Sequence, residues 1–193
     1  MSSAESRRVP PVWQDNKPRF EPSTAPIAGP LTVLMLMKQS FHPENVQIRT
    51  ATFRDREGLL DLMKAYYRYD HIRFDREEIE PSLTELLKHP EFGKAWIACR
   101  GPHRIGYVIM TFAFDLEFGG RQAGITDLFV QSLFRRKGIG RRLLLEVEGF
   151  CHKAGIKSLE LQVTRENSKA VGFYERLGFH VHDRIPMSKR LKA

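Results

Sequence analysis

Arg135-Arg136-Lys137-Gly138-Ile139-Gly140-Arg141-Arg142 is a basic loop with two glycines. It follows an apolar run, Ile125 to Val130, that is typical of a strand, and it opens an amphipathic segment, Leu143 to Ala154, that is typical of a helix. Backbone N–H groups at a helix start have no partner inside the helix and carry the positive end of its dipole. Glycines allow close approach to the backbone, and arginines offer forked donors to phosphate oxygens. The stretch therefore predicts a pyrophosphate site.

Composition indicates one ordinary globular domain of 193 residues. No apolar run approaches the length that spans a bilayer, so we expect no membrane partner and a cytoplasmic protein. Cys99 and Cys151 both have apolar neighbours, which favours buried free thiols over a disulfide scaffold or a metal site. Much of the net charge of +8 gathers at the basic loop and near the C-terminus, which favours a small polyanion over a specific nucleic acid.

The first 44 residues hold seven of the eleven prolines, and we expect residues 1–44 to be a flexible extension. Residues 45–193 then follow a regular pattern. The predicted strands are 46–51, 94–100, 104–114, 123–131, 158–163, 179–182 and 186–191, and the predicted helices are about 59–67, 81–88, 138–154 and 167–177. Gly119-Gly120 is a hairpin signal, and Pro81 is expected in the first turn of its helix. This order predicts an α/β fold with a mixed, mostly antiparallel sheet flanked by helices.

Two segments resemble the GNAT superfamily of acetyl-CoA-dependent N-acetyltransferases. Asp127-Leu128-Phe129-Val130 with Arg135-x-x-Gly138-x-Gly140 is similar to its acetyl-CoA motif, and Asn167-x-x-Ala170-x-x-Phe173-Tyr174-Glu175-x-x-Gly178-Phe179 is similar to its next helix. The likeness covers about residues 45–193, which it makes an N-acetyltransferase domain with the GNAT fold. Within the superfamily, the chain most resembles spermidine- and thialysine-type enzymes, although Thr126 stands where those have a glutamate.

The resemblance implies acetyl-CoA as co-substrate, with no metal. The implied coenzyme-binding residues are Leu128, Phe129, Val130, Arg135, Arg136, Lys137, Gly138, Ile139, Gly140, Arg141, Asn167 and Tyr174. Residues 128–130 would pair with the pantetheine arm as an added strand, and the N–H of Val130 would stabilise the oxyanion. The loop would wrap the pyrophosphate, Asn167 would bind the coenzyme arm, and Tyr174 would lie near the sulfur.

Acetyl transfer to an amine needs a proton acceptor and a proton donor, because a primary amine has a pKa of about 10.4 and the leaving thiolate must be stabilised. Tyr174 is the candidate acid, and Asp127 or Glu117 is the candidate base or holds the cationic amine; each could instead be an ordinary packing or surface residue. In the family, the region after the first helix walls the acceptor site. Here that region contains Tyr66, Tyr67, Tyr69, Asp70 and His71.

These observations lead to one main hypothesis. The chain would move the acetyl group of acetyl-CoA directly to a primary amine of a small molecule, such as an amino acid or a polyamine, in one ternary complex. A protein amine acetyltransferase and a non-catalytic acyl-CoA sensor are the alternatives. Family members often pair as dimers, so a homodimer is compatible with the resemblance.

Overall fold

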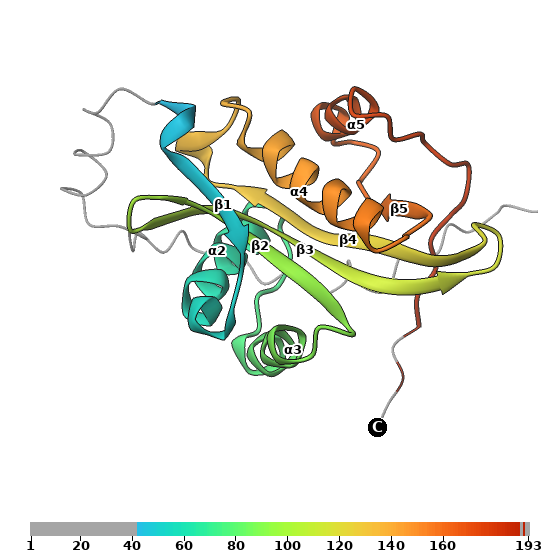
Figure 1. Cartoon of the computed structure of the whole chain (residues 1–193), viewed down its shortest axis with the longest axis horizontal. Helices are drawn as coiled ribbons and strands as arrows, with labels where there is room; N and C mark the ends of the chain where they lie inside the picture. The colour runs from blue at the N-terminus through green and yellow to red at the C-terminus, as the bar shows by residue number, and fades with distance from the viewer. Residues whose placement is uncertain (1–41, 190, 192–193) are drawn as a thin grey trace, which may run out of the picture. The chain divides into compact units, whose positions relative to one another are not determined.

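A computed structural model describes residues 42–189 and residue 191 (Figure 1). Five strands form one sheet in the order β1-β2-β3-β4-β5. Their bounds are Val46–Thr50, Gly93–Arg100, His103–Asp115, Gly120–Val130 and Ser158–Leu161. The first four strands pair antiparallel and β5 pairs parallel to β4. The prediction of a mixed, mostly antiparallel sheet is confirmed.

Helices cover both faces of the sheet (Figure 1). Helices α2 (Arg56–Tyr69) and α3 (Arg76–Lys88) lie on one face, and α4 (Ile139–Lys153) lies on the other, with α5 (Ser168–Glu175) beside it. Three short 3-10 turns complete the described elements: η1 Pro43–Asn45, η2 Phe53–Asp55 and η3 Ser132–Phe134. Helix α5 follows β5 and brings the second sequence motif toward the end of β4.

The helical periodicity of the sequence builds the two layers of the core. On one face, the buried α2 residues Leu59, Leu60, Leu62 and Met63 pack with Ile97, Tyr107, Ile109 and Phe129 of the strands. On the other face, α4 buries Leu143, Leu144 and Val147, and the Cys151 sulfur lies 3.6 Å from the Met110 sulfur. Each fully buried aliphatic side chain contributes about 1.5–3 kcal/mol, so the two layers hold the sheet rigidly between them.

A β-bulge interrupts the pairing of β3 with β4. Ile109 lies opposite Asp127, but its neighbour Met110 lies opposite Ile125, so Thr126 is an extra residue with no partner of its own. Adjacent strand residues point to opposite faces, and opposed residues share a face. Ile125 therefore faces α4, whereas Asp127 and Phe129 face α2. The bulge delivers the Asp127 side chain to the α2 layer.

Three expectations about local structure are wrong. Helix α3 begins at Arg76 rather than at Pro81, and Asp75 caps it by accepting a hydrogen bond from the N–H of Glu77 at 3.1 Å. Pro81 therefore sits inside the helix, where it gives up one backbone hydrogen bond. The predicted strands at 179–182 and 186–191 are absent from residues 179–189 and 191, because no neighbouring strand pairs with them there. Cys151 is buried as expected, but Cys99 is only half-buried.

The predicted extension, residues 1–44, lies outside the described residues apart from His42, Pro43 and Glu44, so the domain boundary stays a prediction. None of the described helices is long and apolar enough to cross a membrane. Between residues 42 and 189, no three His, Cys, Asp or Glu side chains come together as metal ligands would.

Candidate active site

Strand β4 has an open edge near its C-terminal end. Its pairing with β5 stops at Ile125, opposite Leu161, while β4 continues to Val130. The N–H of Gln131 donates to the carbonyl of Ile105 at 2.9 Å, which makes Val130 and Gly106 a pair that exchanges no hydrogen bonds with each other. The N–H and C=O groups of Val130, and by the same alternation those of Leu128, therefore point away from β3. They face the side that β5 has left.

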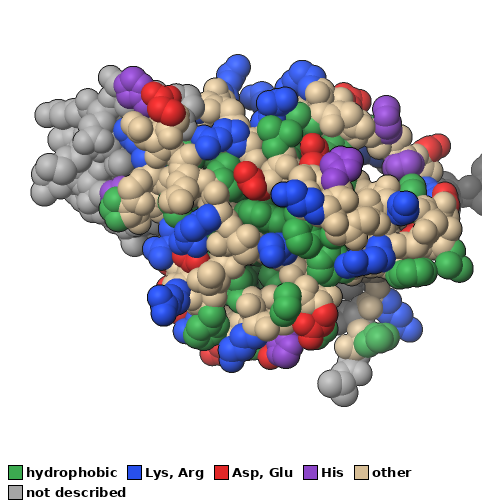
Figure 2. All heavy atoms as spheres, viewed as in Figure 1, with side chains coloured by type: hydrophobic (Ala, Val, Ile, Leu, Met, Phe, Trp, Pro, Cys, Tyr) green, Lys and Arg blue, Asp and Glu red, His purple; other side chains and the backbone are tan. Residues whose placement is uncertain are grey.

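The basic loop turns sharply into α4 beside this edge. Gly138 caps the helix with φ of 80°, and Arg136 has φ of 61°. Both residues therefore adopt the left-handed conformation that favours glycine. Within the described chain, no backbone acceptor pairs with the N–H groups of Gly138, Ile139, Gly140 and Arg141. The side chains of Arg136 and Arg141 are exposed, and Figure 2 shows Lys and Arg side chains gathered over the start of α4 and over α5. This arrangement suits a bound phosphate ester.

Asp127 is a buried acid beside the open edge. Its side chain is only 9% exposed, and the hydroxyl of Tyr107 donates to its carboxylate at 3.1 Å. Burial raises the pKa of Asp127 from 3.8 to about 6, and the hydrogen bond from Tyr107 opposes part of that rise. A carboxylate with this pKa is ionised at neutral pH yet binds a proton more readily than an ordinary aspartate.

Two tyrosines of α2 lie near Asp127. Tyr66 and Tyr67 of α2 pack edge to face, with ring centroids 5.6 Å apart, and Tyr66 also packs 5.8 Å from the Phe129 ring. Burial raises the pKa of Tyr66, and the nearby Asp70, Asp127 and Tyr174 raise it further. Burial raises the pKa of Tyr174 to about 12, so its hydroxyl keeps its proton at neutral pH. Tyr174 from α5 and Asp127 from β4 thus both raise the pKa of Tyr66.

The rest of the predicted acceptor wall is less enclosed. Burial, with a smaller contribution from the Asp127 charge, raises the pKa of Tyr67 to about 12, which places Tyr67 with the buried cluster. Tyr69 and His71 are exposed at the end of α2, and His71 adopts a φ of 57°. The structure therefore joins Tyr66 and Tyr67 to Asp127, leaves Tyr69 and His71 exposed, and keeps the half-buried Asp70 close enough to raise the pKa of Tyr66.

Arg135 has partners other than the expected phosphate. Its Nε donates to the carbonyl of Val130 at 2.8 Å, and its guanidinium carbon lies 4.0 Å from the centroid of the Tyr69 ring. The same carbon lies 5.3 Å from the Phe129 ring. This side chain ties the end of α2 to the end of β4. It holds the carbonyl of the same residue whose N–H faces the open edge.

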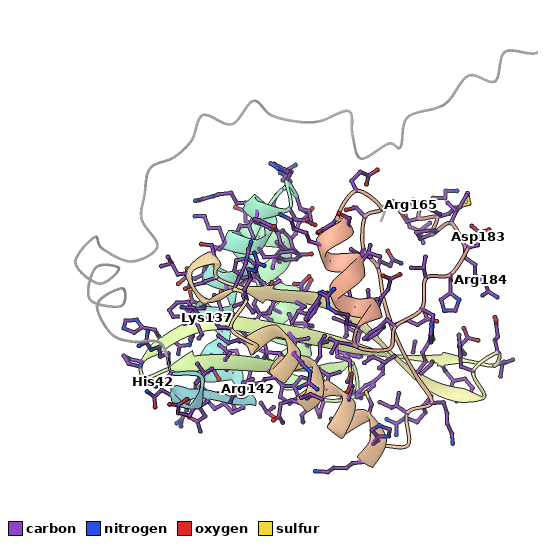
Figure 3. All side chains as sticks on the ribbon, turned by 90° about the horizontal axis from the view of Figure 1, so that it is seen from above. His42, Lys137, Arg142, Arg165, Asp183 and Arg184 are labelled. Atoms are coloured by element: carbon purple, nitrogen blue, oxygen red, sulfur yellow. The ribbon has the colours of Figure 1, made fainter. Side chains whose placement is uncertain are left out.

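The structure does not bring Glu117, the other candidate base, together with Asp127. Glu117 lies in the turn between β3 and β4, where both of its oxygens accept hydrogen bonds from Arg184 at 2.8 and 2.9 Å. Seven residues of extended strand separate Gly120 from Asp127, a distance of about 23 Å. Figure 3 shows Arg184 at the opposite end of the described fold from Lys137 and Arg142, which flank the start of α4. Of the two carboxylates, only Asp127 lies at the open edge.

Two further side chains complete the site. The side-chain oxygen of Asn167 accepts the N–H of Ala170 at 3.2 Å and caps α5, which leaves its NH2 group to donate to a ligand. Tyr107, fully buried on β3, was not among the predicted site residues although it contacts Asp127. The only signal for it was a polar aromatic inside an otherwise apolar strand.

Comparison with known proteins assigns the sequence to a family. The Acetyltransferase (GNAT) family matches residues 56–179, which include the open strand, the basic loop and α5. This chain belongs to the GNAT family of acetyltransferases. Membership implies acetyl-CoA as co-substrate, and the residues present fit it: the open edge of β4 offers peptide groups to the pantetheine amides, and the start of α4 offers N–H groups to the phosphates.

Individual relatives agree with that assignment. An uncharacterized N-acetyltransferase of Methanocaldococcus jannaschii is 31% identical over 68% of this chain, which spans only 59% of that relative. Spermidine N(1)-acetyltransferase of Thermoplasma acidophilum is 26% identical over 72% of this chain and 91% of that protein. Thialysine N-epsilon-acetyltransferase of Bos taurus is 29% identical over 69% of this chain and 83% of that protein. The resemblance to these two enzyme types is thus confirmed as a similarity.

A solved structure shares the fold. An integron cassette protein from the mobile metagenome of Cole Harbour Salt Marsh superposes with a TM-score of 0.68 and is 28% identical. The match covers 76% of this chain and 91% of that one. The predicted GNAT fold is confirmed.

Proposed function

We propose that this GNAT acetyltransferase moves the acetyl group of acetyl-CoA directly to a primary amine of a small molecule, with Asp127 as the base. The observation that carries the proposal is the position of Asp127, a buried carboxylate with a raised pKa on the part of β4 whose edge β5 leaves open. Acetyl-CoA supplies the activated thioester. The residues of the chain supply the proton transfers and the stabilisation of charge.

Asp127 takes a proton from the amine. A primary amine with a pKa of about 10.4 must lose a proton before or during attack on the thioester carbon. Raising the pKa of the acceptor from 3.8 to about 6 reduces the unfavourable difference between donor and acceptor. By Brønsted behaviour, part of this change in pKa appears as faster proton transfer, within the 10²–10⁴-fold rate gain that is typical of general base catalysis.

Val130 and Tyr174 act on the thioester rather than on the amine. As the C–N bond forms, negative charge develops on the carbonyl oxygen, and the N–H of Val130 points into the edge where that oxygen would lie. As the C–S bond breaks, the sulfur needs a proton. The phenol of Tyr174, which is protonated at neutral pH, donates it and recovers a proton from solvent.

The lining of the site favours a small cationic acceptor. Tyrosine rings and a carboxylate together attract an ammonium group through its charge and through the faces of the rings. Tyr66, Tyr67 and Asp127 provide these groups within one cluster. The similarity to a spermidine acetyltransferase supports an amine of this class, with polyamines and amino acids as the first candidates.

The test is thiol release from acetyl-CoA over a panel of polyamines, amino acids and a basic peptide. We expect turnover with at least one small amine and at least a 10²-fold lower kcat for Asp127→Asn. Asp61→Asn, a change of an exposed α2 carboxylate, is the matched control. Turnover with the peptide alone would favour a protein amine acetyltransferase. Thermal stabilisation by CoA without any turnover would favour a non-catalytic sensor.

A further inference from the structure

Tyr107 is a polar side chain in the apolar layer between the sheet and α2. It is 0% exposed and belongs to one core cluster with Leu59 and Leu62 of α2. A buried hydroxyl without a hydrogen-bond partner costs free energy, and a phenylalanine would fill nearly the same volume without that cost. The hydroxyl at this position therefore indicates a role beyond packing.

The sheet places this hydroxyl against the proposed base. Tyr107 lies opposite Phe129, two residues along β4 from Asp127. Tyr107 and Asp127 are therefore diagonal neighbours on the same face of the sheet. The Tyr107 hydroxyl donates to Oδ2 of Asp127 at 3.1 Å, and the Phe129 ring packs beside the Tyr107 ring with 6.4 Å between centroids. Among the described residues, Tyr107 is the only donor to this carboxylate, so Oδ1 is left to accept from a ligand.

We propose that Tyr107 is a positioning residue for acetyl transfer, which holds Oδ2 of Asp127, directs Oδ1 toward the acceptor amine and favours the ionised carboxylate. This inference rests on the proposed role of Asp127 as the base. A reacting side chain keeps a productive orientation only where packing and a hydrogen bond from a second residue hold it. A hydrogen bond to the ionised form also offsets part of the cost of burial, so the base is ready to take a proton at neutral pH.

The neighbouring groups leave this task to Tyr107. Besides Tyr107, the titratable side chains near Asp127 are Tyr66 and Tyr67 of α2. Burial raises the pKa of all three phenols, so each keeps its proton at neutral pH. Burial also raises the pKa of Asp127, and the hydrogen bond from Tyr107 is the interaction that lowers it. No described Lys, Arg or His lowers the pKa of Asp127, so loss of the Tyr107 hydroxyl should act on the carboxylate without an offsetting cation.

Tyr107→Phe tests the inference in the full chain by two measurements. Carbon-13 NMR of the Asp127 carboxyl group follows its protonation directly, and the dependence of kcat/KM on pH follows the base in the reaction. Loss of a hydrogen bond to a charged group should raise both apparent pKa values by about 1. Looser orientation should lower kcat about 10-fold while the Kd of CoA is unchanged. Val147→Ala, which removes buried atoms of α4, is the matched control for lost packing and should keep the pKa values of the parent.

A second variant reverses the expected direction. Site-specific 3-fluorotyrosine at position 107 nearly keeps the shape of the residue but has a more acidic phenol. It is therefore a stronger donor and should lower the pKa of Asp127. Changes of that pKa in the same direction for both replacements, or no change in either, would overturn the inference.

The two measurements separate this inference from the proposed function. If Asp127→Asn loses activity while the NMR pKa of Asp127 is the same in the parent and in Tyr107→Phe, the role of Tyr107 is overturned and Asp127 remains the base. If the NMR pKa rises in Tyr107→Phe but the pH dependence of kcat/KM does not follow it, Asp127 is not the base. The positioning role of Tyr107 would then fall with it.

Discussion

Replacing Asp127 with asparagine should stabilise the fold while it removes the proposed base. Burial makes ionised Asp127 costly, as its raised pKa shows. Asparagine has nearly the same shape, carries no charge and keeps an oxygen for the hydroxyl of Tyr107. The variant should therefore be more stable near neutral pH and much less active.

The size of the effect follows from the pKa. Ionising Asp127 in the folded state, with its pKa near 6 against 3.8, costs about 3 kcal/mol of stability once the pH is well above 6. Asparagine must hydrogen-bond its own NH2 group, so the expected net gain is about 1–3 kcal/mol. In the parent chain, the cost is absent below the unfolded pKa and fully present above the folded pKa. Stability from this residue therefore falls as pH rises between those values.

Urea unfolding of both proteins at about pH 7.5 and about pH 5 measures this difference. The folded parent binds nearly one more proton at the lower pH, so its stability relative to the variant should rise by about 1.4 kcal/mol. Other titrating groups are common to both proteins and cancel in the comparison. In the same pH range, kcat/KM of the parent should fall as the base becomes protonated, with an apparent pKa near 6.

The control is Asp61→Asn, which changes an exposed carboxylate on α2. It shows how much of any change comes from loss of a surface charge alone. The reasoning would be refuted if Asp127→Asn lowered stability at both pH values by the same amount. That result would mean that the carboxylate is a net stabilising partner of Tyr107 rather than a costly buried charge.

Substitutions at four further positions probe the rest of the candidate site. Tyr174→Phe should lower kcat by about 10²-fold while the Kd of CoA changes little, and unchanged turnover would exclude Tyr174 as the acid. Gly138→Ala should lower the free energy of unfolding by about 1–2 kcal/mol because φ is 80°. Gly138→Asp should in addition repel the phosphates, so calorimetry should show CoA binding at least ~10-fold weaker for Gly138→Asp than for Gly138→Ala. Equal CoA affinities of the two variants would count against the phosphate site. Arg135→Lys keeps the charge but loses the planar guanidinium stacked on Tyr69, so kcat should fall about 10-fold. Adding Tyr69→Ala to this variant should lower kcat little further, because the two side chains act through the same contact. Additive losses of kcat would refute that shared role.

The local features of this fold could be predicted from the sequence because short-range physics determines them. The conformational freedom of glycine predicts the loop before α4, and Gly138 does adopt a positive φ. Gly119 and Gly120 do so in the predicted hairpin, with φ of 73° and 129°. Apolar periodicity likewise gave α2, α4 and the first five strands within a few residues.

Features that depend on distant partners could not be predicted. The first turn of α3 is charged and lacks apolar periodicity, so only its cap, Asp75, signals the true start. Glu117 resembled a site carboxylate until Arg184, 67 residues away in sequence, was found to pair with it. From the sequence, Tyr107 looks like an ordinary core residue, because its neighbours in the chain do not indicate that its hydroxyl donates to Asp127 on the adjacent strand. Alternation alone places Ile125 and Asp127 on one face, and only the bulge separates them.

The bulge at Thr126 determines which face of the sheet each later residue of β4 points to, and the candidate site depends on that. If Thr126 joined the ladder as a regular residue opposite Ile109, every later residue of the strand would shift by one position. Asp127 would turn toward α4, and Leu128 and Val130 would give their N–H groups to β3 instead of to the coenzyme. Hydrophobic content would be unchanged, yet the proposed base, Asp127, and the proposed oxyanion donor, Val130, would both be lost. Substitutions near residue 126 that favour a regular ladder should therefore abolish activity without unfolding the protein.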